Sequence, residues 1–478
     1  MAYDWIPPFK LRTLRIINCR VGPGFGMWLQ SQTELIDATL SGNGISDSIP
    51  REWLLQISSQ LIQLDLSNNE FRGSLPLHLK FPNLNSIDLS HNILEGLLPL
   101  WSTIATSLII ENNLFFGPIP SNIDQLMPDL QVLFLSENNL NGTIPPSVCN
   151  MLNLRILSLR SNQFSGEFSH AWSVGSNMVF LDVGQNNLSG NIPTSLGVLS
   201  SLEVLKLNNN NFGGEIPDSL QNCSRLASID LGNNRLSGEI PLWIGGSSQL
   251  HILDLSRNNF SGTIPKCLNN LTLLVKDSKR VKNSNSVAAY YDEQATLTLK
   301  GEELVYNTTL DLVKSIDLSS NNLQGEIPEE ISSLILLGTL NLSVNQLIGR
   351  IPSKIGNLHW FETLDLSHNH LTGQIPQSLS SLTSLSHLNL SYNNLSGRIP
   401  SGNQLQTLND SLIYIDNPSL CGVPLSTKCP GDKNFTIEDA NDKNEDRNDD
   451  MLWFYVSVVL GFIVGFWGVC GTLILKTA

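Results

Sequence analysis

The sequence predicts a leucine-rich-repeat solenoid in which one short strand per repeat joins a parallel, concave sheet, with an island insertion and one transmembrane helix. The evidence is an asparagine that returns every 24 residues, a 39-residue interruption of that rhythm, and 25 consecutive residues without charge. Leucine-based repeats of roughly 20 to 29 residues bury their apolar face only by stacking on neighbours. The asparagines are Asn138, Asn162, Asn186, Asn210, Asn234 and Asn258, then Asn321, Asn345, Asn369 and Asn393.

Each asparagine sits in one frame of apolar residues. Leucine or isoleucine stands three, five and eight residues before it, glycine four after it, and Ile-Pro six and seven after it. Extended backwards with looser spacing, the frame gives 15 units: repeats 1–11 in residues 1–272 and repeats 12–15 in residues 313–412. The earlier positions are Asn113, Asn92, Asn69, Asn43 and Cys19; the clearest unit is Leu226, Ile229, Leu231, Asn234, Leu236, Gly238, Ile240 and Pro241.

The asparagine slot has a physical reason. Leucines fill the interior while the chain turns sharply off its strand, which leaves main-chain groups of the turn without partners. A buried asparagine side chain pairs with those groups, each of which would otherwise cost about 1–3 kcal/mol. Glycine allows the dihedral angles of the turn, and Ile-Pro begins an extended return arc.

The interruption is a non-repeat island at residues 273–312. Its first part is basic and its second part alternates apolar and polar residues, which predicts a strand at 296–300. An island inside a solenoid is free of the packing rules of the repeats and favours a binding surface. A disordered insertion is the alternative. The basic residues are Lys276, Lys279, Arg280 and Lys282.

The chain after the last repeat is expected to form a cap, a spacer and a membrane helix. Cys421 and Cys429 predict a disulfide loop within a cap at residues 413–430. Residues 431–450 hold eight acidic and three basic side chains, typical of a disordered juxtamembrane spacer. Residues 451–475 give roughly 37 Å of uncharged helix, enough to cross a bilayer, and leave residues 476–478 as a cytoplasmic remnant.

Small residues inside the membrane segment recur every four positions, at Ser457, Gly461 and Gly465. Such a stripe lets a second helix approach closely. The alternative is the general abundance of glycine in membrane helices. No kinase signature follows the helix. Signalling is therefore expected to pass through a partner protein.

Composition narrows the partners and the compartment. The formal net charge of -15 and the low charged fraction of 15% disfavour nucleic acid as a partner. Asn-x-Ser/Thr sequons fit a secreted glycoprotein, although asparagine and serine are abundant enough here to supply them by chance. The glycosylation candidates are Asn141, Asn187, Asn222, Asn259, Asn270, Asn307, Asn409 and Asn434.

Aspartates in the slot four before the asparagine raise the question of catalysis. Asp230 and Asp254 are expected on adjacent strands, as in a paired-carboxylate site. The same slot recurs around the sheet, however, and no histidine or nucleophile stands at a fixed spacing from it. We expect no enzyme, no catalytic residue, no cofactor and no metal. The aspartates are Asp65, Asp88, Asp182, Asp230, Asp254, Asp317 and Asp365.

Off-consensus residues in the strands of the middle repeats are the candidates for a ligand-binding face. Large aromatic and arginine side chains are common binding anchors. Ordinary variation of a surface is the alternative. The candidates are Phe134, Glu137, Arg160, Lys206, Asn208 and Arg257.

The whole architecture resembles the plant leucine-rich-repeat receptor-like proteins, with their 24-residue repeats, island, four further repeats, Cys-containing end, acidic spacer and single membrane helix. Lys300 and Tyr306 in the island match a motif of that family, as do residues 313–323 and the Gly-rich segment 461–471. Within the family, the chain is most similar to the fungal-xylanase-receptor-like immune receptors.

The resemblance implies a single-pass sensor in the plasma membrane, with extracellular repeats that bind a microbial or peptide ligand. It implies contact of Gly461 and Gly465 with an adaptor receptor-like kinase. It also implies contact of Lys300 and Tyr306 with a somatic-embryogenesis-type co-receptor kinase. Alternatives are a developmental peptide receptor and a polygalacturonase-inhibitor-like binder. Unlike the family, residues 1–8 contain no apolar signal segment, so we expect a fragment of a longer receptor.

Overall fold

The computed structural model describes residues 5–99, 101–168, 172–276 and 313–430, together with the backbone of 295–299 and 302–306. Several predicted features lie outside these residues: the acidic spacer at 431–450, the membrane segment at 451–475, Lys300, Asn307 and Asn434. Within the described parts of the chain, no helix is both long and apolar enough to pass through a bilayer.

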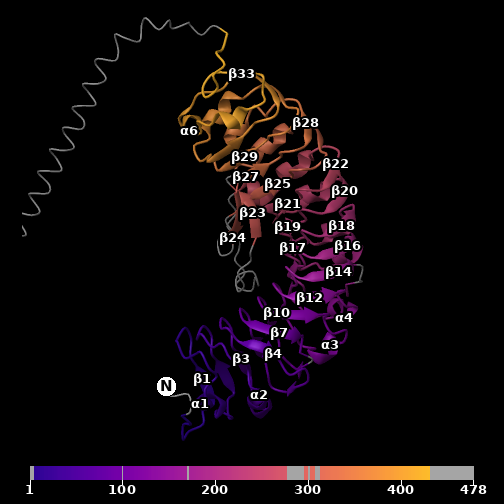
Figure 1. The fold of residues 1–478 in the computed structure, drawn as a ribbon. Coiled ribbons are helices and arrows are strands. Elements are labelled where there is room, and N and C mark those ends of the chain that lie inside the picture. Colours follow the sequence, from indigo (N-terminus) through magenta and orange to yellow (C-terminus); the bar gives the residue numbers. More distant parts are fainter. Residues whose placement is uncertain are drawn as a thin grey trace, which may run out of the picture. The chain divides into compact units, whose positions relative to one another are not determined.

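A single parallel sheet of 15 strands runs through residues 13–389 (Figure 1), with one strand for each predicted repeat. The prediction of a leucine-rich-repeat solenoid with a concave parallel sheet is therefore confirmed. The strands are β1 (Thr13–Arg15), β2 (Asp37–Thr39), β3 (Gln63–Asp65), β6 (Ser86–Asp88), β9 (Ser107–Ile109), β11 (Val132–Phe134), β13 (Ile156–Ser158), β15 (Phe180–Asp182), β17 (Val204–Lys206), β19 (Ser228–Asp230), β21 (Ile252–Asp254), β25 (Ser315–Asp317), β27 (Thr339–Asn341), β29 (Thr363–Asp365) and β31 (His387–Asn389).

Further short strands follow the asparagine of most repeats and pair with their equivalents in the next repeat. Nine of them form one sheet: β4 (Arg72–Ser74), β7 (Ile93–Leu97), β10 (Leu114–Gly117), β12 (Asn139–Gly142), β14 (Gln163–Glu167), β16 (Asn187–Asn191), β18 (Asn211–Gly214), β20 (Arg235–Glu239) and β22 (Asn259–Ser261). Smaller groups are β5 (Lys80–Phe81) with β8 (Ser102–Thr103), β26 (Gln324–Glu326) with β28 (Gln346–Ile348), and β30 (Thr372–Gln374) with β32 (Asn394–Arg398) and β33 (Ser419–Cys421).

The return arcs contain short helices. Where Ile-Pro precedes a 3-10 helix, the proline is its extended N-cap residue, with ψ of 133° at Pro193 and 137° at Pro241. Because proline has no amide to leave unpaired, it suits that position. The helices are α1 (Met27–Gln30), α2 (Arg51–Ile57), α3 (Ile123–Leu126), α4 (Pro146–Cys149), η1 (Thr194–Val198), η2 (Asp218–Asn222), η3 (Leu242–Gly246), η4 (Lys266–Asn270), α5 (Thr272–Val275), η7 (Glu329–Ser333), η8 (Ile355–Asn357), η9 (Gln377–Ser381), α6 (Asn403–Thr407) and η10 (Ser411–Tyr414).

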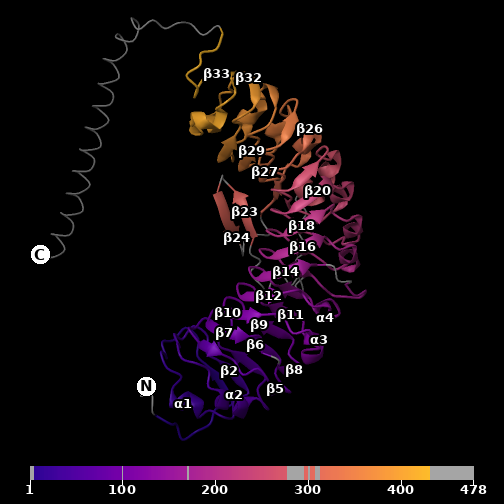
Figure 2. The same ribbon diagram turned by 45° about the vertical axis from the view of Figure 1, so that its right-hand side comes forward.

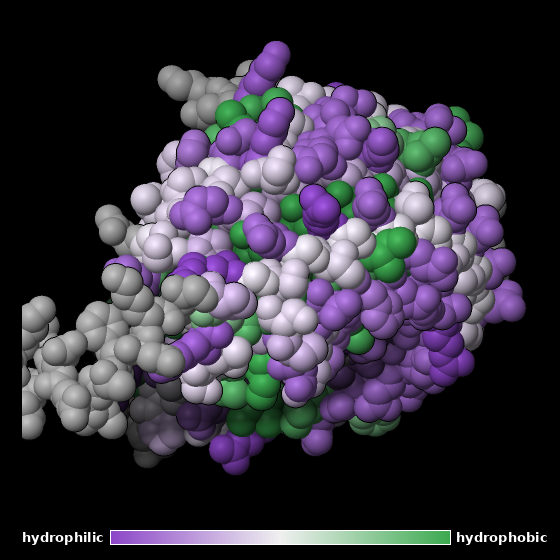
Figure 3. Space-filling view, turned by 90° about the horizontal axis from the view of Figure 1, so that it is seen from above, coloured by the Kyte–Doolittle hydropathy of each residue, from purple (hydrophilic) through white to green (hydrophobic). Residues whose placement is uncertain are grey.

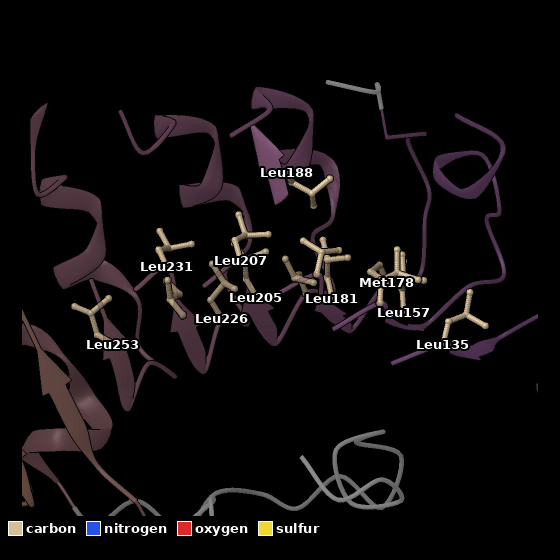
Figure 4. Close-up of a cluster of buried hydrophobic side chains, with 14 of the residues drawn as sticks. Leu135, Leu157, Met178, Leu181, Leu188, Leu205, Leu207, Leu226, Leu231 and Leu253 are labelled. Atoms are coloured by element: carbon tan, nitrogen blue, oxygen red, sulfur yellow. The ribbon is translucent and has the colours of Figure 1, made fainter. Parts of the chain in front are cut away.

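The core is a continuous row of leucines between the sheet and the return arcs. The middle residue of successive strands points inward, and Leu157, Leu181, Leu205 and Leu253 are at most 1% exposed. Figure 4 shows these side chains following one another from strand to strand. In the face seen in Figure 3, hydrophobic residues form patches among hydrophilic ones. Burial of leucines between repeats is thus the main force that stacks the units.

The asparagine ladder joins each repeat to the one before it. Asn234 accepts a hydrogen bond from the Phe212 amide of the preceding repeat at 3.0 Å. Its side-chain amide donates to the Leu207 carbonyl of that repeat at 3.0 Å, and to the carbonyls of Leu231 and Gly232 in its own turn. The predicted role of the slot is confirmed, with the addition that the bonds cross between units. Asn417 makes the same contacts beyond the last strand, a rung that the sequence frame omitted.

The ladder and the sheet both continue across the island. β21 pairs in register with β25, so that Asp254 lies beside Asp317. Asn321 accepts from the Phe260 amide at 3.0 Å, although the two residues are 61 positions apart. Within the island, β23 (Ala295–Leu299) and β24 (Glu302–Tyr306) form an antiparallel hairpin, labelled in Figure 2. β23 overlaps the strand expected at 296–300 and begins one residue earlier.

The cysteines fall into two groups. Cys421 and Cys429 are both disulfide-bonded. Among the other described cysteines, Cys149 and Cys223 are buried free thiols, and burial raises their pKa to about 12 and about 11. These two thiols are therefore packing residues without a reactive thiolate at neutral pH.

Candidate functional site

The third residue of each main strand forms a row on the concave face. Because the middle residue of each strand points into the core, its two neighbours point outward. In the central repeats this row is acidic, and the strand pairings place its members side by side. In order, the row reads Asp182, Lys206, Asp230, Asp254, Asp317 and Asn341.

At most aspartates of this row, the serine two residues later donates a hydrogen bond to the carboxylate. The Ser256 hydroxyl donates to Asp254 Oδ1 at 2.6 Å, and the Ser367 hydroxyl donates to Asp365 in the same way at 2.7 Å. Glycine replaces that serine at Gly184 and Gly232. Among the described residues, the hydrogen bond to Asp230 comes from the Gly232 amide, at 3.2 Å.

Neighbouring side chains crowd against the two glycines. A Cβ on Gly184 would lie 2.3 Å from Asn208 Oδ1, and a Cβ on Gly232 would lie 2.9 Å from Asp254 Oδ1. A cavity of about 320 Å³ occupies this part of the face. Its lining residues are Gln185, Asn208, Asn209, Asp230, Gly232, Asn233, Asp254, Ser256, Arg257, Asp317, Ser319, Ser320, Asn341 and Ser343. We refer to it as the concave cavity.

Burial and the nearness of other carboxylates make ionisation unfavourable for two carboxyl groups of the concave cavity. Burial and the neighbouring Asp254 raise the pKa of Asp317 to about 7, against partial compensation by hydrogen bonds from Ser319 and Asn341. Burial and Asp254 also raise the pKa of Asp230 well above its ordinary value, although Lys206 opposes this. Both carboxyls thus keep their protons more readily than exposed aspartates do.

Asn208 and Arg257, two of the predicted ligand-face residues, line the concave cavity. Lys206 is fully buried, with its ammonium 5.6 Å from the centroid of the Phe180 ring. This corrects the expectation that Lys206 touches a ligand directly. Arg160 is largely covered and lies 4.0 Å from the Asp182 carboxylate.

The remaining two ligand-face candidates lie away from the concave cavity. Phe134 packs with Val132 and Phe180 on a small apolar cluster around Ile156 and Val179, which we call the concave apolar cluster. Glu137 accepts a hydrogen bond from the exposed Asn112 amide at 2.8 Å.

Sequence reasoning weighed the aspartates only as catalytic groups and did not predict that three of them line one cavity. One sequence signal was available, because Gly232, which lines the cavity, stands where neighbouring repeats carry serine. The side chains that line the cavity, within the parts described, are carboxyl, amide and hydroxyl groups with one guanidinium. This set suits binding of hydrogen-bond donors.

The other predicted site residues are placed as follows. Tyr306 ends β24, with its backbone paired to Ala295. Lys300 and the membrane-segment residues Ser457, Gly461 and Gly465 lie outside the described residues. Six glycosylation candidates are exposed, as a glycan requires: Asn141, Asn187, Asn222, Asn259, Asn270 and Asn409.

Comparison with known proteins identifies the family. The family model for the Leucine Rich Repeat matches residues 60–81, 129–151, 153–174, 201–223, 225–247, 249–271, 312–334, 361–382 and 384–409. Receptor-like protein EIX2 of Solanum lycopersicum is 40% identical over 487 residues, which cover 99% of this chain and 47% of that protein. The chain is a plant leucine-rich-repeat receptor-like protein. Within that family it belongs with the EIX group.

Other plant receptors are also similar to this receptor-like protein. Receptor-like protein 32 of Arabidopsis thaliana is 38% identical over 163 residues, which cover 32% of this chain and 18% of that protein. The Arabidopsis receptor kinase HAESA, solved with the peptide hormone IDA and the co-receptor SERK1, is 32% identical with a TM-score of 0.64. That match covers 85% of this chain and 65% of the HAESA chain. The chain spans about half the length of EIX2.

Proposed function

We propose that this receptor-like protein binds a microbial or peptide ligand on its concave face at the plasma membrane and signals in plant defence through partner receptor kinases. The observation that carries the proposal is the concave cavity, where strands β17 to β27 of the sheet contribute polar groups to one hollow. The 40% identity to tomato EIX2 supports the assignment to cell-surface sensing.

A second candidate function is perception of an endogenous developmental peptide. The specific observation in its favour is the similarity to the ectodomain of HAESA, which was solved with a peptide hormone and a co-receptor. The two readings share a binding face and differ in the source of the ligand.

The test of the proposed function uses plant cells that express the full chain. We expect a microbial culture filtrate to trigger a burst of reactive oxygen and to increase co-immunoprecipitation of a co-receptor kinase. Replacing Lys300 and Tyr306 of the island with alanine should remove this recruitment, because the island and the last repeats are the proposed contact. Equal recruitment by the double variant would overturn the co-receptor assignment. A response to hormone peptides alone would favour the developmental function.

A separate prediction concerns the proposed adaptor kinase, which would contact the stripe of Ser457, Gly461 and Gly465. The variant Gly461→Leu with Gly465→Leu should remain in the membrane, since leucine is at least as apolar as glycine, but lose the adaptor. Co-purification of the kinase measures this. As a control, the variant Val458→Leu with Ile463→Leu should leave co-purification unchanged. Normal yield from the double glycine variant would mean that the kinase is held elsewhere.

A further inference from the structure

Exposed apolar side chains gather on two neighbouring strands of the nine-stranded sheet, β7 and β10 (Figure 2). Ile93, Leu97, Leu114 and Phe116 are between 40% and 49% exposed, and we call them the lateral apolar patch. Phe116 pairs with Leu97, and Leu97 reaches over Gly117, where a Cβ would lie 2.5 Å from Leu97 Cδ2. An exposed apolar surface of this kind marks a contact site or an aggregation liability.

The same positions are polar in the strands that follow. Leu114 and Phe116 are the first and third residues after the ladder asparagine, and both are exposed. In β12 these positions hold Asn139 and Asn141, and from β14 to β22 they hold asparagine, glutamine, arginine, serine or glycine. The repeat frame therefore does not require apolar residues there, and the patch needs a separate explanation.

A glycosylation sequon borders the lateral apolar patch. It consists of Asn141, Gly142 and Thr143 at the end of β12, and the asparagine and the threonine are exposed. Because Phe116 pairs with Asn139, Asn141 lies one strand across and two residues further along, on the same face of the sheet. With strands about 4.8 Å apart and a rise of about 3.3 Å per residue, the Cβ atoms of Phe116 and Asn141 are roughly 8 Å apart.

An exposed proline extends the apolar surface to the sequon. The register of β10 with β12 places Pro118 beside Asn141. Their closeness also shows at Gly142, where a Cβ would lie 3.4 Å from Pro118 Cβ. On the side of β10, the Asn141 side chain is therefore bordered by Pro118, with Phe116 and Leu97 beyond it.

The chemistry of an N-linked glycan suits this arrangement. Its first sugar, N-acetylglucosamine, is joined to the Nδ2 atom of the asparagine, and one pyranose ring covers the distance from Asn141 to Phe116. One face of that ring presents C–H groups, which the electron-rich face of an aromatic side chain attracts. The hydroxyl groups of the sugar can stay in water while the C–H face packs on the protein.

Two other sequons on the same sheet have polar neighbours and provide a comparison. Asn187 pairs with Ser165, and Asn259 pairs with Ser237. Glycans at these positions would stand beside a serine hydroxyl, without an aromatic ring to pack on.

We propose that Asn141 carries an N-linked glycan whose first N-acetylglucosamine packs its C–H face on Phe116 and Pro118 and shields the lateral apolar patch. The glycan is then part of the packed surface of these repeats. Because N-glycosylation belongs to secreted and cell-surface proteins, this inference rests on the extracellular position of the repeats in the proposed function.

The test is the rate at which endoglycosidase H cleaves the glycan on the folded full chain. The chain is expressed in plant cells with kifunensine, so that every glycan keeps its oligomannose form, and mass spectrometry of glycopeptides follows each site. Phe116→Ser should speed cleavage at Asn141 at least tenfold, because the enzyme must reach the bond next to the packed sugar. Serine occupies the same position at Ser165, so the sheet accepts it. Cleavage at Asn187 should be unchanged.

The matched control is Ile93→Asn, which removes an apolar side chain of the same patch two strands away from Asn141. It introduces the residue found in the same position at Asn139. Cleavage at Asn141 should stay within twofold of the wild-type rate.

A second measurement asks whether the glycan shields the patch. Asn141→Gln should at least double the fluorescence of anilinonaphthalene sulfonate, a dye that binds exposed apolar surface. Adding Phe116→Ser to this variant should return the fluorescence to the wild-type level. If Asn141→Gln alone is not secreted, the added Phe116→Ser should restore secretion.

The outcomes distinguish this inference from the proposed function. An unoccupied Asn141 overturns the inference, and glycans at the other exposed sequons of the same sample would leave the extracellular position standing. A chain without any glycan would count against both. Equal cleavage rates with and without Phe116, dye binding that ignores Asn141→Gln, or secretion that Phe116→Ser does not restore would each show that the patch is open to another partner.

Discussion

Asn321→Ala should lower the free energy of unfolding of the repeat array by about 3 kcal/mol, which is a large effect for a single polar side chain. Asn321 is 8% exposed and sits where the array resumes after the island. Its loss would leave the Phe260 amide and the carbonyls of Leu255 and Leu318 without these partners. Urea denaturation followed by circular dichroism measures the change.

The matched control is the next residue. The Asn322 side chain donates an exposed hydrogen bond to Asn259, and Asn322→Ala should cost within about 0.5 kcal/mol. Similar losses of unfolding free energy for both variants would show that the asparagine ladder does not stabilise the junction across the island. Leucine packing alone would then join the repeats before and after it.

The array should become less stable as pH rises from 5 to 8. Burial and Asp254 raise the pKa of Asp317 to about 7, so the folded state holds a proton that an unfolded aspartate, with an ordinary pKa of 3.8, has already released. Stability from a raised pKa is complete below the unfolded value and is lost as pH passes the folded value. Asp317 alone should account for a loss of about 2 to 3 kcal/mol over this range. Asp230, Asp88 and Glu111, whose pKa values burial also raises, contribute with the same sign.

Asp317→Asn tests this contribution, because it removes the titration and keeps the shape. Unfolding free energies at pH 5 and pH 8 should differ by about 2 to 3 kcal/mol less in the variant than in the wild type. Asp365→Asn, in the same slot two strands further along, is the control and should retain the wild-type difference. An unchanged difference in Asp317→Asn would mean that the Asp317 carboxyl is already ionised at pH 5.

The stacked strands and the ladder could be predicted from sequence because they repeat. Fifteen strands follow fifteen frames, since leucines at fixed spacing have one way to be buried together. Asn417 escaped because the frame before it differs: η10 stands where a strand would be, yet the asparagine still closes the turn. At this position the need to pair the backbone groups of the turn is met even though the leucine pattern is not.

The residue before each ladder position shows a constraint that the sequence hides. It adopts a left-handed backbone in unit after unit, with φ of 52° at Asn233, 55° at Val344 and 54° at Tyr392. Residue type gives little warning, because valine and tyrosine rarely take this conformation. The stacked turns on both sides impose it.

The candidate site was predicted in part. Asn208 and Arg257 stood out as departures from the repeat consensus and do line the cavity. Lys206 stood out equally but is buried over Phe180, because neighbouring side chains on a concave sheet crowd one another. The cavity itself depends on three-dimensional neighbours rather than on any motif, because successive repeats each contribute residues to its lining.

The asparagine joint also bears on how such genes change over time. The bond from Leu236 to Asn258 links residues 22 positions apart, and the bond from Phe260 to Asn321 links residues 61 positions apart, with lengths of 2.9 and 3.0 Å. The joint is therefore indifferent to the length of chain that intervenes. Whole units can be duplicated or deleted, and new segments can enter between them, while every surviving junction is remade by the same chemistry. A receptor built this way can acquire new recognition surfaces without solving its folding problem again.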